Sequence, residues 1–334
     1  MTEPYAAPTP TPRSEHTQRA AVPLAEFIPP AGLANPHLQT VMSSVARKML
    51  LPRREAAFLE AAEEHIVEVD GVRLMVHANL HEHQPLIMMI PGWLGNSRSS
   101  YVLSCAKALY EAGYSVARIN LRDHGDTAHL NQGLFNSALI DEVVTLSQQL
   151  PEQFNSRGAG LIGYSLGGNF ALRVARAIPN LPVLAICPAI APANTMTTID
   201  RNVVYQRYFV QKWRASWTAK QNAFPEIYNV SDAFKLTTVA SLTDYFITYH
   251  SGFPTASEYF AAYDLSGSAL EGVSAQILAA RGDPIIPYQQ YQNLPGSINI
   301  ELTDKGGHGA YLESWNLASW ADRYAVEHFA QFFS

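Results

Sequence analysis

A serine between two glycines, in Gly163-Tyr164-Ser165-Leu166-Gly167, constrains the fold of this chain more than any other sequence feature. The apolar residues before it predict a buried strand, and those after it, from Phe170 to Ile178, share one face of a helix. On a strand–turn–helix of this kind the serine adopts a strained backbone conformation and is presented above the sheet. We interpret Ser165 as a candidate nucleophile; the alternative is a glycine-bounded turn with an incidental serine.

Short apolar runs alternate with helical patterns along most of the chain. Such alternation predicts an α/β fold with a mostly parallel sheet covered by helices on both faces. The predicted strands are 65–69 and 72–80, which form a hairpin around Asp70-Gly71, then 85–90, the strand before Ser165, 115–120, 181–187, 276–280 and 299–302. The predicted helices are 99–113, 139–154, the one after Ser165, and a last one that carries Trp315, Trp320, Tyr324 and Phe329.

Two segments depart from this alternation. Residues 1–30 hold seven prolines among Ala, Thr and charged residues, which predicts a flexible arm before a domain over 31–334. Residues 192–263 are helical in pattern and rich in Tyr, Phe and Trp. Because this insertion follows the strand after Ser165, where ligand crevices open at strand ends, we favour a lid over a binding cleft. An ordinary helical subdomain core has the same composition.

The composition excludes several classes of function. The net charge is −6 and the 23 Lys and Arg residues are scattered, so no basic stripe favours nucleic acid or anionic lipid. No apolar run approaches the roughly 18 residues of a membrane span, and the N-terminus lacks a secretory signal pattern. Cys105 and Cys187 are best interpreted as small core residues. We expect a cytoplasmic protein without metal or cofactor, acting on a small molecule.

A serine hydroxyl needs a base, and the base needs an orienting acid. The order expected after a turn of this kind is serine, acid, histidine. His308 lies between glycines in a loop after a predicted strand, whereas His250 falls in the insertion and His328 in the last helix. We therefore favour His308 as the base, against the alternative of a surface-loop histidine.

The acid has two candidates. Asp283, in Arg281-Gly282-Asp283-Pro284, ends the preceding strand, where a third member must sit to reach the outer imidazole nitrogen. Asp304 is only four residues before His308, and a turn-capping role suits it better. We favour Asp283. For the oxyanion we expect the backbone N–H groups of Leu166 and of Trp93, which follows Gly92 at the end of strand 85–90.

Two further groups of polar residues carry weaker signals. His77, His81 and His83 lie at a predicted strand end and loop without the fixed spacing of a metal site, so we favour a solvated turn. The loop 122–126, Arg-Asp-His-Gly-Asp, follows another strand and either rims the pocket or forms structural hydrogen bonds.

With these residues identified, the chain resembles the YheT-like branch of the α/β-hydrolase superfamily. This AB-hydrolase-4 group includes plant EMB8-like proteins and yeast ethyl-ester synthases/esterases, and the resemblance covers roughly residues 31–334. Its most specific piece is Asn35-Pro36-His37-Leu38-Gln39-Thr40, which on physical grounds is only a turn that starts a helix. The segment 91–97 is similar to the group's oxyanion loop, the turn at Ser165 to its elbow, and Asp283-Pro284 and Gly307-His308 to its acid and base segments.

The resemblance implies carboxylic-ester hydrolysis, with some members transferring acyl groups to alcohols. One position departs from the group: its usual histidine before the first oxyanion-loop glycine is Pro91 here. We therefore expect a cofactor-free serine hydrolase that cleaves carboxylic esters, with short to medium acyl chains favoured. The alternatives are an acyltransferase that passes the acyl group to an alcohol and a non-catalytic binding protein of the same fold.

Overall fold

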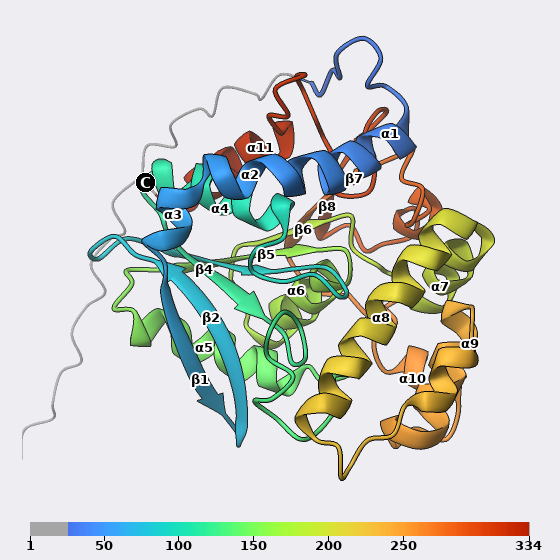
Figure 1. The fold of residues 1–334 in the computed structure, drawn as a ribbon. Helices are drawn as coiled ribbons and strands as arrows, with labels where there is room; N and C mark the ends of the chain where they lie inside the picture. The colour runs from blue at the N-terminus through green and yellow to red at the C-terminus, as the bar shows by residue number, and fades with distance from the viewer. Residues whose placement is uncertain (1–25, 334) are drawn as a thin grey trace, which may run out of the picture.

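Eight strands form one sheet in the order β1-β2-β4-β3-β5-β6-β7-β8 (Figure 1). The computed structural model describes residues 26–333. The β1–β2 and β2–β4 pairs are antiparallel, and all other neighbours are parallel, as the alternation predicted. The strands are β1 (Glu63–Val69), β2 (Val72–Asn79), β3 (Leu86–Ile90), β4 (Ser115–Asn120), β5 (Ala159–Tyr164), β6 (Val183–Ile186), β7 (Ala275–Ala280) and β8 (Ile298–Thr303).

The predicted hairpin is confirmed by the β1–β2 pair. Val69 pairs with Val72, which leaves a two-residue loop of Asp70 and Gly71. Both loop residues have positive φ, 51° and 78°. This is the geometry of a type I′ turn, whose twist matches that of the two strands and which Asp-Gly favours.

Helices cover both faces of the sheet, because the central strands are apolar on both sides. In β3 all five residues are buried: Leu86, Met88 and Ile90 face one core, and Ile87 and Met89 face the other. The helices are α1 (Pro36–Val41), α2 (Arg47–Arg54), α3 (Ala56–Glu60), α4 (Ser100–Glu111), α5 (Asp141–Gln153), α6 (Leu166–Ala177), α7 (Pro192–Arg201), α8 (Val203–Ala223), α9 (Val239–Phe246), α10 (Ala256–Ala261) and α11 (Trp320–Ala330), with single turns of other helix types at 42–46, 231–235, 247–251 and 288–291.

The insertion between β6 and β7 contains α7 to α10. In Figure 1 these helices form a group at the right, away from the β1–β2 hairpin. Their aromatic side chains contact one another: Trp213 lies 5.0 Å from Trp217, and Phe246 lies 5.8 Å from Tyr259, between ring centroids. These side chains belong to one apolar core that the insertion shares with the sheet, and several of them also line a cavity next to Ser165.

The N-terminal segment joins the fold before residue 31. Residues 1–25, most of the arm predicted from composition, lie outside the described residues. Phe27 is buried, with its ring 5.5 Å from that of Tyr311 and 5.7 Å from that of Trp320. Within residues 26–333 no helix combines the length and the apolar character that crossing a bilayer requires.

The three histidines at 77, 81 and 83 have separate surroundings. The prediction of a solvated turn is wrong for His77. This residue is buried in β2, and burial lowers its pKa. His81 stacks on Tyr110 at 4.0 Å between ring centroids, and its Nε2 lies 2.9 Å from the Tyr110 carbonyl. Within the described part of the chain these histidines form no metal-binding group.

Candidate active site

Ser165 lies at the turn between β5 and α6, at the carboxyl end of a central strand. Its φ is 54°, a strained value for a residue with a side chain. A Cβ on Gly163 would come within 2.0 Å of the Gly167 carbonyl oxygen, and one on Gly167 within 2.4 Å of the carbonyl oxygens of Ile90 and Pro91. Both positions therefore require glycine.

The backbone of Ser165 holds this turn in place. Its N–H donates to the Ile186 carbonyl at 2.9 Å, and its carbonyl accepts from the N–H groups of Asn169 at 3.1 Å and Ala189 at 3.2 Å. The side-chain hydroxyl takes no part in these bonds. The turn is thus fixed by main-chain contacts, and the hydroxyl remains available for chemistry.

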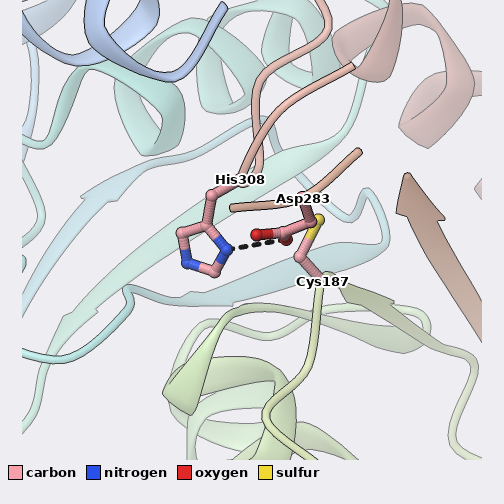
Figure 2. A group of neighbouring side chains, drawn as sticks. All are labelled: Cys187, Asp283 and His308. Carbon is pink, nitrogen blue, oxygen red and sulfur yellow. Dashed lines mark hydrogen bonds and ion pairs between the residues drawn. The ribbon is translucent and has the colours of Figure 1, made fainter. Parts of the chain in front are cut away.

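His308 and Asp283 form a hydrogen-bonded pair in the loops that follow β8 and β7 (Figure 2). His308 Nδ1 lies 2.8 Å from Asp283 Oδ2, and the Asp283 carboxylate is almost completely buried. The other carboxylate oxygen, Oδ1, accepts from the N–H groups of Ile285 at 2.8 Å and Ile286 at 2.9 Å. The carboxylate is therefore fixed by three hydrogen bonds and orients the imidazole with Nε2 on the opposite side.

The other candidates for base and acid lie elsewhere. Asp304 is exposed and pairs with Arg281 through a 2.9 Å contact. His250 lies among aromatic rings of the insertion, 6.3 Å from Trp217 between ring centroids. His328 is buried in α11, and that burial lowers its pKa to about 4. Of the candidate histidines, His308 is the one that lies against Asp283.

The loop of His308 lies beside the turn of Ser165. The N–H of Gly309 donates to Cys187 Sγ at 3.2 Å, directly after β6, and a Cβ on Gly309 would meet the Tyr164 ring at 3.8 Å. Among the described residues no hydrogen bond joins the Ser165 hydroxyl to His308. Such bonds are often long in proteins without substrate and shorten in the substrate complex.

Cys187 is buried beside this pair, as the prediction of a core cysteine implied. Donor atoms of Cys187, Asp283 and His308 lie within 4.8 Å of one another. Burial raises the pKa of the Cys187 thiol well above its usual value. The thiol accepts from Gly309 N–H and lies 3.5 Å from the Tyr311 hydroxyl.

Two backbone N–H groups next to Ser165 have no acceptor within the described residues, those of Trp93 and Leu166. Leu166 is the first residue of α6, so its N–H points out of the helix end. Trp93 follows Gly92, and a Cβ on Gly92 would lie only 3.2 Å from that of Ser165. The sequence suggested the same two N–H groups as donors to an oxyanion, and that role stays a prediction.

His124 orders the loop that carries Trp93, a role that the sequence did not reveal. Its Nε2 accepts from the Leu94 N–H at 3.1 Å, and its Nδ1 donates to the Arg122 carbonyl at 2.8 Å. Burial lowers the pKa of His124 to about 4, so the ring is neutral at neutral pH and Nε2 stays an acceptor. The Leu94 N–H is thereby occupied, which leaves Trp93 as the free donor of this loop. The only sequence signal was the position of loop 122–126 after a strand.

An apolar cavity of about 90 Å³ opens beside Ser165. Ser165 and Leu166 line it at the turn, and the insertion supplies most of the remaining wall. The other lining residues are Trp93, Phe135, Ser137, Ala189, Pro192, Thr195, Met196, Ile199, Phe209, Trp213, Val239, Thr243, Phe246, Tyr259, Phe260, Tyr263 and Ile285. A second, larger hollow lies at the opposite ends of the strands, near Pro85, Tyr114 and Arg157, far from this chemistry.

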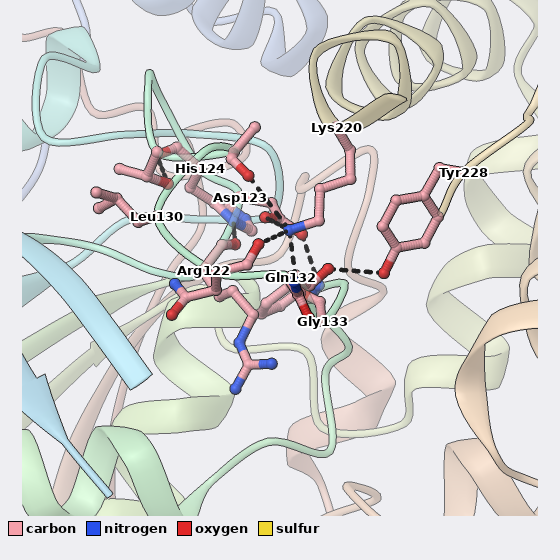
Figure 3. A network of polar contacts seen from close by, with 12 residues as sticks. Arg122, Asp123, His124, Leu130, Gln132, Gly133, Lys220 and Tyr228 are labelled. Atoms are coloured by element: carbon pink, nitrogen blue, oxygen red, sulfur yellow. Dashed lines mark hydrogen bonds and ion pairs between the residues drawn. The ribbon is translucent and has the colours of Figure 1, made fainter. Parts of the chain in front are cut away.

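A buried lysine fixes helix α8 of the insertion to the loop after β4 (Figure 3). Lys220 Nζ donates to Asp123 Oδ1 at 2.7 Å and to the carbonyls of Asn131 at 2.6 Å, Gly133 at 3.0 Å and Ala128 at 3.3 Å. Burial lowers the pKa of Lys220 and raises that of Asp123, and the attraction between the two charges opposes both shifts. Loop 122–126 therefore has the structural role that was one of its two predicted alternatives.

Replacing Lys220 with methionine is expected to destabilise the protein by about 3 to 5 kcal/mol, because Asp123 would remain buried without a counter-charge. Urea unfolding of the purified variant measures this loss. The double variant Lys220→Met/Asp123→Asn should recover part of it. As a matched control, Lys235→Met removes an exposed pair with Asp232 and should leave the midpoint nearly unchanged. Equal midpoints for Lys220→Met and the unmodified protein would contradict the assigned role.

Comparison with known proteins agrees with this architecture. Residues 87–325 match the model of the Alpha/beta hydrolase family. YheT of Escherichia coli, whose name classes it provisionally as an esterase, is 24% identical over 302 residues, which cover 86% of this chain and 87% of that protein. The embryogenesis-associated protein EMB8 of Picea glauca is 20% identical over 322 residues, covering 89% and 70%.

Solved structures agree at the level of the fold. The esterase Pf2001 of Pyrococcus furiosus superimposes with a TM-score of 0.54 at 13% identity, covering 85% of this chain and 94% of that one. The relatives YheT and EMB8 confirm the branch suggested by the sequence motifs. The family match covers well over half of the chain, and the chain therefore belongs to the alpha/beta hydrolase family.

Proposed function

We propose that this protein is a serine hydrolase that cleaves carboxylic esters through an acyl-enzyme on Ser165. The observation that carries the proposal is the 2.8 Å contact between the buried Asp283 carboxylate and His308, next to a serine with strained backbone geometry. A serine, histidine and aspartate in this relation form the usual machinery of acyl transfer. The esterase names of YheT and Pf2001 support the same reaction class.

In the first half of the reaction, Ser165 Oγ bonds to the ester carbonyl carbon while its proton passes to Nε2 of His308. Asp283 holds the tautomer in which Nε2 is free and stabilises the imidazolium that forms. The negative charge on the carbonyl oxygen is met by the N–H groups of Trp93 and Leu166, and each such donor lowers the barrier by about 3 kcal/mol. The ester C–O bond then breaks, and the alcohol leaves with the proton from Nε2.

In the second half, water attacks the acyl carbon and gives its proton to His308 Nε2. The bond from the acyl carbon to Ser165 Oγ breaks, Oγ takes back a proton, and a carboxylic acid is released. An alcohol in place of water would give a new ester from the same intermediate. Product analysis with and without added ethanol separates hydrolysis from transfer, and a complete absence of turnover would favour a binding protein of this fold.

The cavity suggests the acyl group as its occupant, because its walls are mainly aromatic and aliphatic. We expect kcat/KM for p-nitrophenyl esters to rise about fourfold with each added methylene, since burying one is worth about 0.8 kcal/mol, until the cavity is full. A volume of about 90 Å³ favours short chains, and longer ones require side chains of the insertion to move. A series from acetate to palmitate measures the profile.

Enlarging the cavity should shift this profile. Met196 lines the cavity on α7, so Met196→Ala should move the optimum to a longer acyl chain. Met49 is 71% exposed on α2, away from the cavity, and Met49→Ala is the matched control.

Hydrogen exchange in 192–263 should also slow when a phosphonyl adduct forms on Ser165, as a lid requires. A flat profile with no change in exchange would leave the insertion as structural core.

A further inference from the structure

Helix α1 begins at the segment Asn35-Pro36-His37-Leu38-Gln39-Thr40, whose meaning the sequence alone did not give. Asn35 Oδ1 accepts from the N–H groups of His37 at 2.9 Å and Leu38 at 3.1 Å, and Pro36 occupies the first turn. Side-chain capping and a proline in the first turn both stabilise a helix start. The position of this short helix is therefore well defined, although most of its outer face is exposed.

Thr40 makes a direct contact with the backbone of His308. Its Oγ1 accepts from the His308 N–H at 3.0 Å and donates its own proton to the Pro36 carbonyl at 2.8 Å. Because the hydroxyl proton is committed to Pro36, the oxygen can act only as acceptor toward His308. Thr40 is 268 residues away in sequence, yet its hydroxyl is the acceptor of the His308 N–H.

Gln39 fixes the same loop four residues further on. Its Nε2 donates to the carbonyls of Leu33 at 2.8 Å and Leu312 at 3.1 Å, and its Oε1 accepts from the Leu312 N–H at 2.8 Å. The side chain is completely buried, so the loss of any of these bonds would leave a buried polar group unpaired. The segment from His308 to Leu312 is thus attached to α1 at both ends.

Two glycines let α1 approach the acid and base loops closely. A Cβ on Gly307 would come within 2.4 Å of Thr40 Oγ1 and 2.5 Å of the Pro36 carbonyl oxygen. A Cβ on Gly282, next to Asp283, would meet Pro36 Cβ at 3.1 Å. Helix α1 therefore packs against both loops, and its first turn contacts the residues adjacent to Asp283 and His308.

The same helix also contacts the insertion. His37 Nδ1 lies 2.9 Å from the Tyr205 hydroxyl on α8, and the two rings stack at 5.8 Å between centroids with 16° between their planes. One short segment thus touches the acid loop, the base loop and the insertion that walls the cavity.

We propose that α1 holds the His308 loop in its active position, and that Thr40 and Gln39 are positioning residues for His308. Without the Thr40 acceptor, the glycine-rich loop 306–309 would lose the bond that sets the direction of the His308 backbone, and a displacement of about 1 Å can cost on the order of 100-fold in rate. The inference rests on the proposed role of His308 as the base.

The test compares Thr40→Val, which keeps the shape but removes the acceptor, with Thr40→Ser, which keeps the acceptor. We expect Thr40→Val to lower kcat by about 10- to 100-fold, to leave KM for a short ester within about twofold, and to slow phosphonylation of Ser165 in proportion. For Thr40→Ser we expect kcat, KM and the rate of phosphonylation to stay close to those of the unmodified protein. The low-field proton resonance of His308 Nδ1–H, shared with Asp283, should weaken or shift only in Thr40→Val.

A second pair of variants serves if Thr40→Val does not fold. Asn35→Ala removes the cap of α1 at an exposed position, and Asn35→Asp keeps an acceptor there. We expect a smaller loss of kcat for Asn35→Ala and none for Asn35→Asp. Rates and resonances equal to those of the unmodified protein in a folded Thr40→Val, or in Asn35→Ala where Thr40→Val does not fold, would overturn the proposed role of α1.

The two proposals fail in different ways. An unmodified protein that neither turns over esters nor reacts at Ser165 would count against the proposed function. In that case the resonance of the His308–Asp283 proton still tests whether α1 positions His308, because this measurement requires no turnover. Suppose that the unmodified protein is active and that Thr40→Val and Thr40→Ser have the same kcat. This result would count against the positioning role of α1 and not against the proposed function.

Discussion

Replacing Ser165 with alanine is expected to abolish ester hydrolysis while the protein remains folded. The hydroxyl is the nucleophile in the proposed reaction, and in a well-studied serine protease the loss of that group costs about 10⁶-fold in kcat. The turn should survive, because its hydrogen bonds to Ile186, Asn169 and Ala189 are made by the Ser165 backbone. Turnover of a p-nitrophenyl ester and the thermal unfolding of the purified variant measure both statements.

Ser147→Ala is the matched control for this substitution. Ser147 is also buried, but its hydroxyl bonds to the Val143 carbonyl within α5, away from the cavity. The control should retain normal turnover. Undiminished hydrolysis by a folded Ser165→Ala protein would rule out Ser165 as the nucleophile.

The second large effect is expected at Asp283. Asparagine would keep an oxygen for the N–H groups of Ile285 and Ile286 but would present an amide N–H to His308 Nδ1. The imidazole would then hold its proton on Nε2, the nitrogen that must accept the proton of Ser165. A tautomer error of this kind costs about 10⁴-fold in the best-studied serine triad, and we expect a similar loss of kcat for Asp283→Asn.

Asp304→Asn is the comparison for the acid. Asp304 is exposed and contacts Arg281 rather than His308, so its loss should change kcat only slightly. Steady-state kinetics of the two variants on the same ester ranks them. A larger loss for Asp304→Asn than for Asp283→Asn would assign the acid to Asp304.

Local sequence signals were enough for most of the sheet. Asp70-Gly71 between two alternating runs predicted the β1–β2 hairpin, because only a few residues accept positive φ in a two-residue loop. The apolar run 85–90 predicted a strand that is covered on both faces, and all five residues of β3 are buried. The glycines at 163 and 167 predicted the turn of Ser165, since any side chain there would meet backbone.

The pairing of Asp283 with His308 was suggested by their order and by their place after two successive strands. Parallel strands bring their carboxyl ends to one edge of a sheet, so two loops that follow such strands meet there. Asp304, although nearer in sequence, lies directly after β8 and pairs with Arg281. Order along the chain was therefore a better guide than distance along it.

Contacts between distant segments were beyond the sequence. The bond from His308 to Thr40 spans 268 residues, and no local pattern around Thr40 indicates an acceptor for it. In sequence Lys220 looks like an ordinary helix lysine. Its ion pair depends on Asp123 in a distant loop, which the residues around Lys220 do not indicate. His124 and Phe27 are similar cases, because burial by a remote element gives each its role.

Mass spectrometry of the protein after reaction with a fluorophosphonate tests the central claim most directly. The probe reports an activated serine without requiring the natural ester. We expect one phosphonyl group per chain, located on the peptide that contains Ser165, absent from Ser165→Ala and formed far more slowly in Asp283→Asn. A protein that remains unlabelled, or that carries the adduct on another residue while Ser165→Ala reacts equally well, would contradict the assignment of Ser165 as the nucleophile.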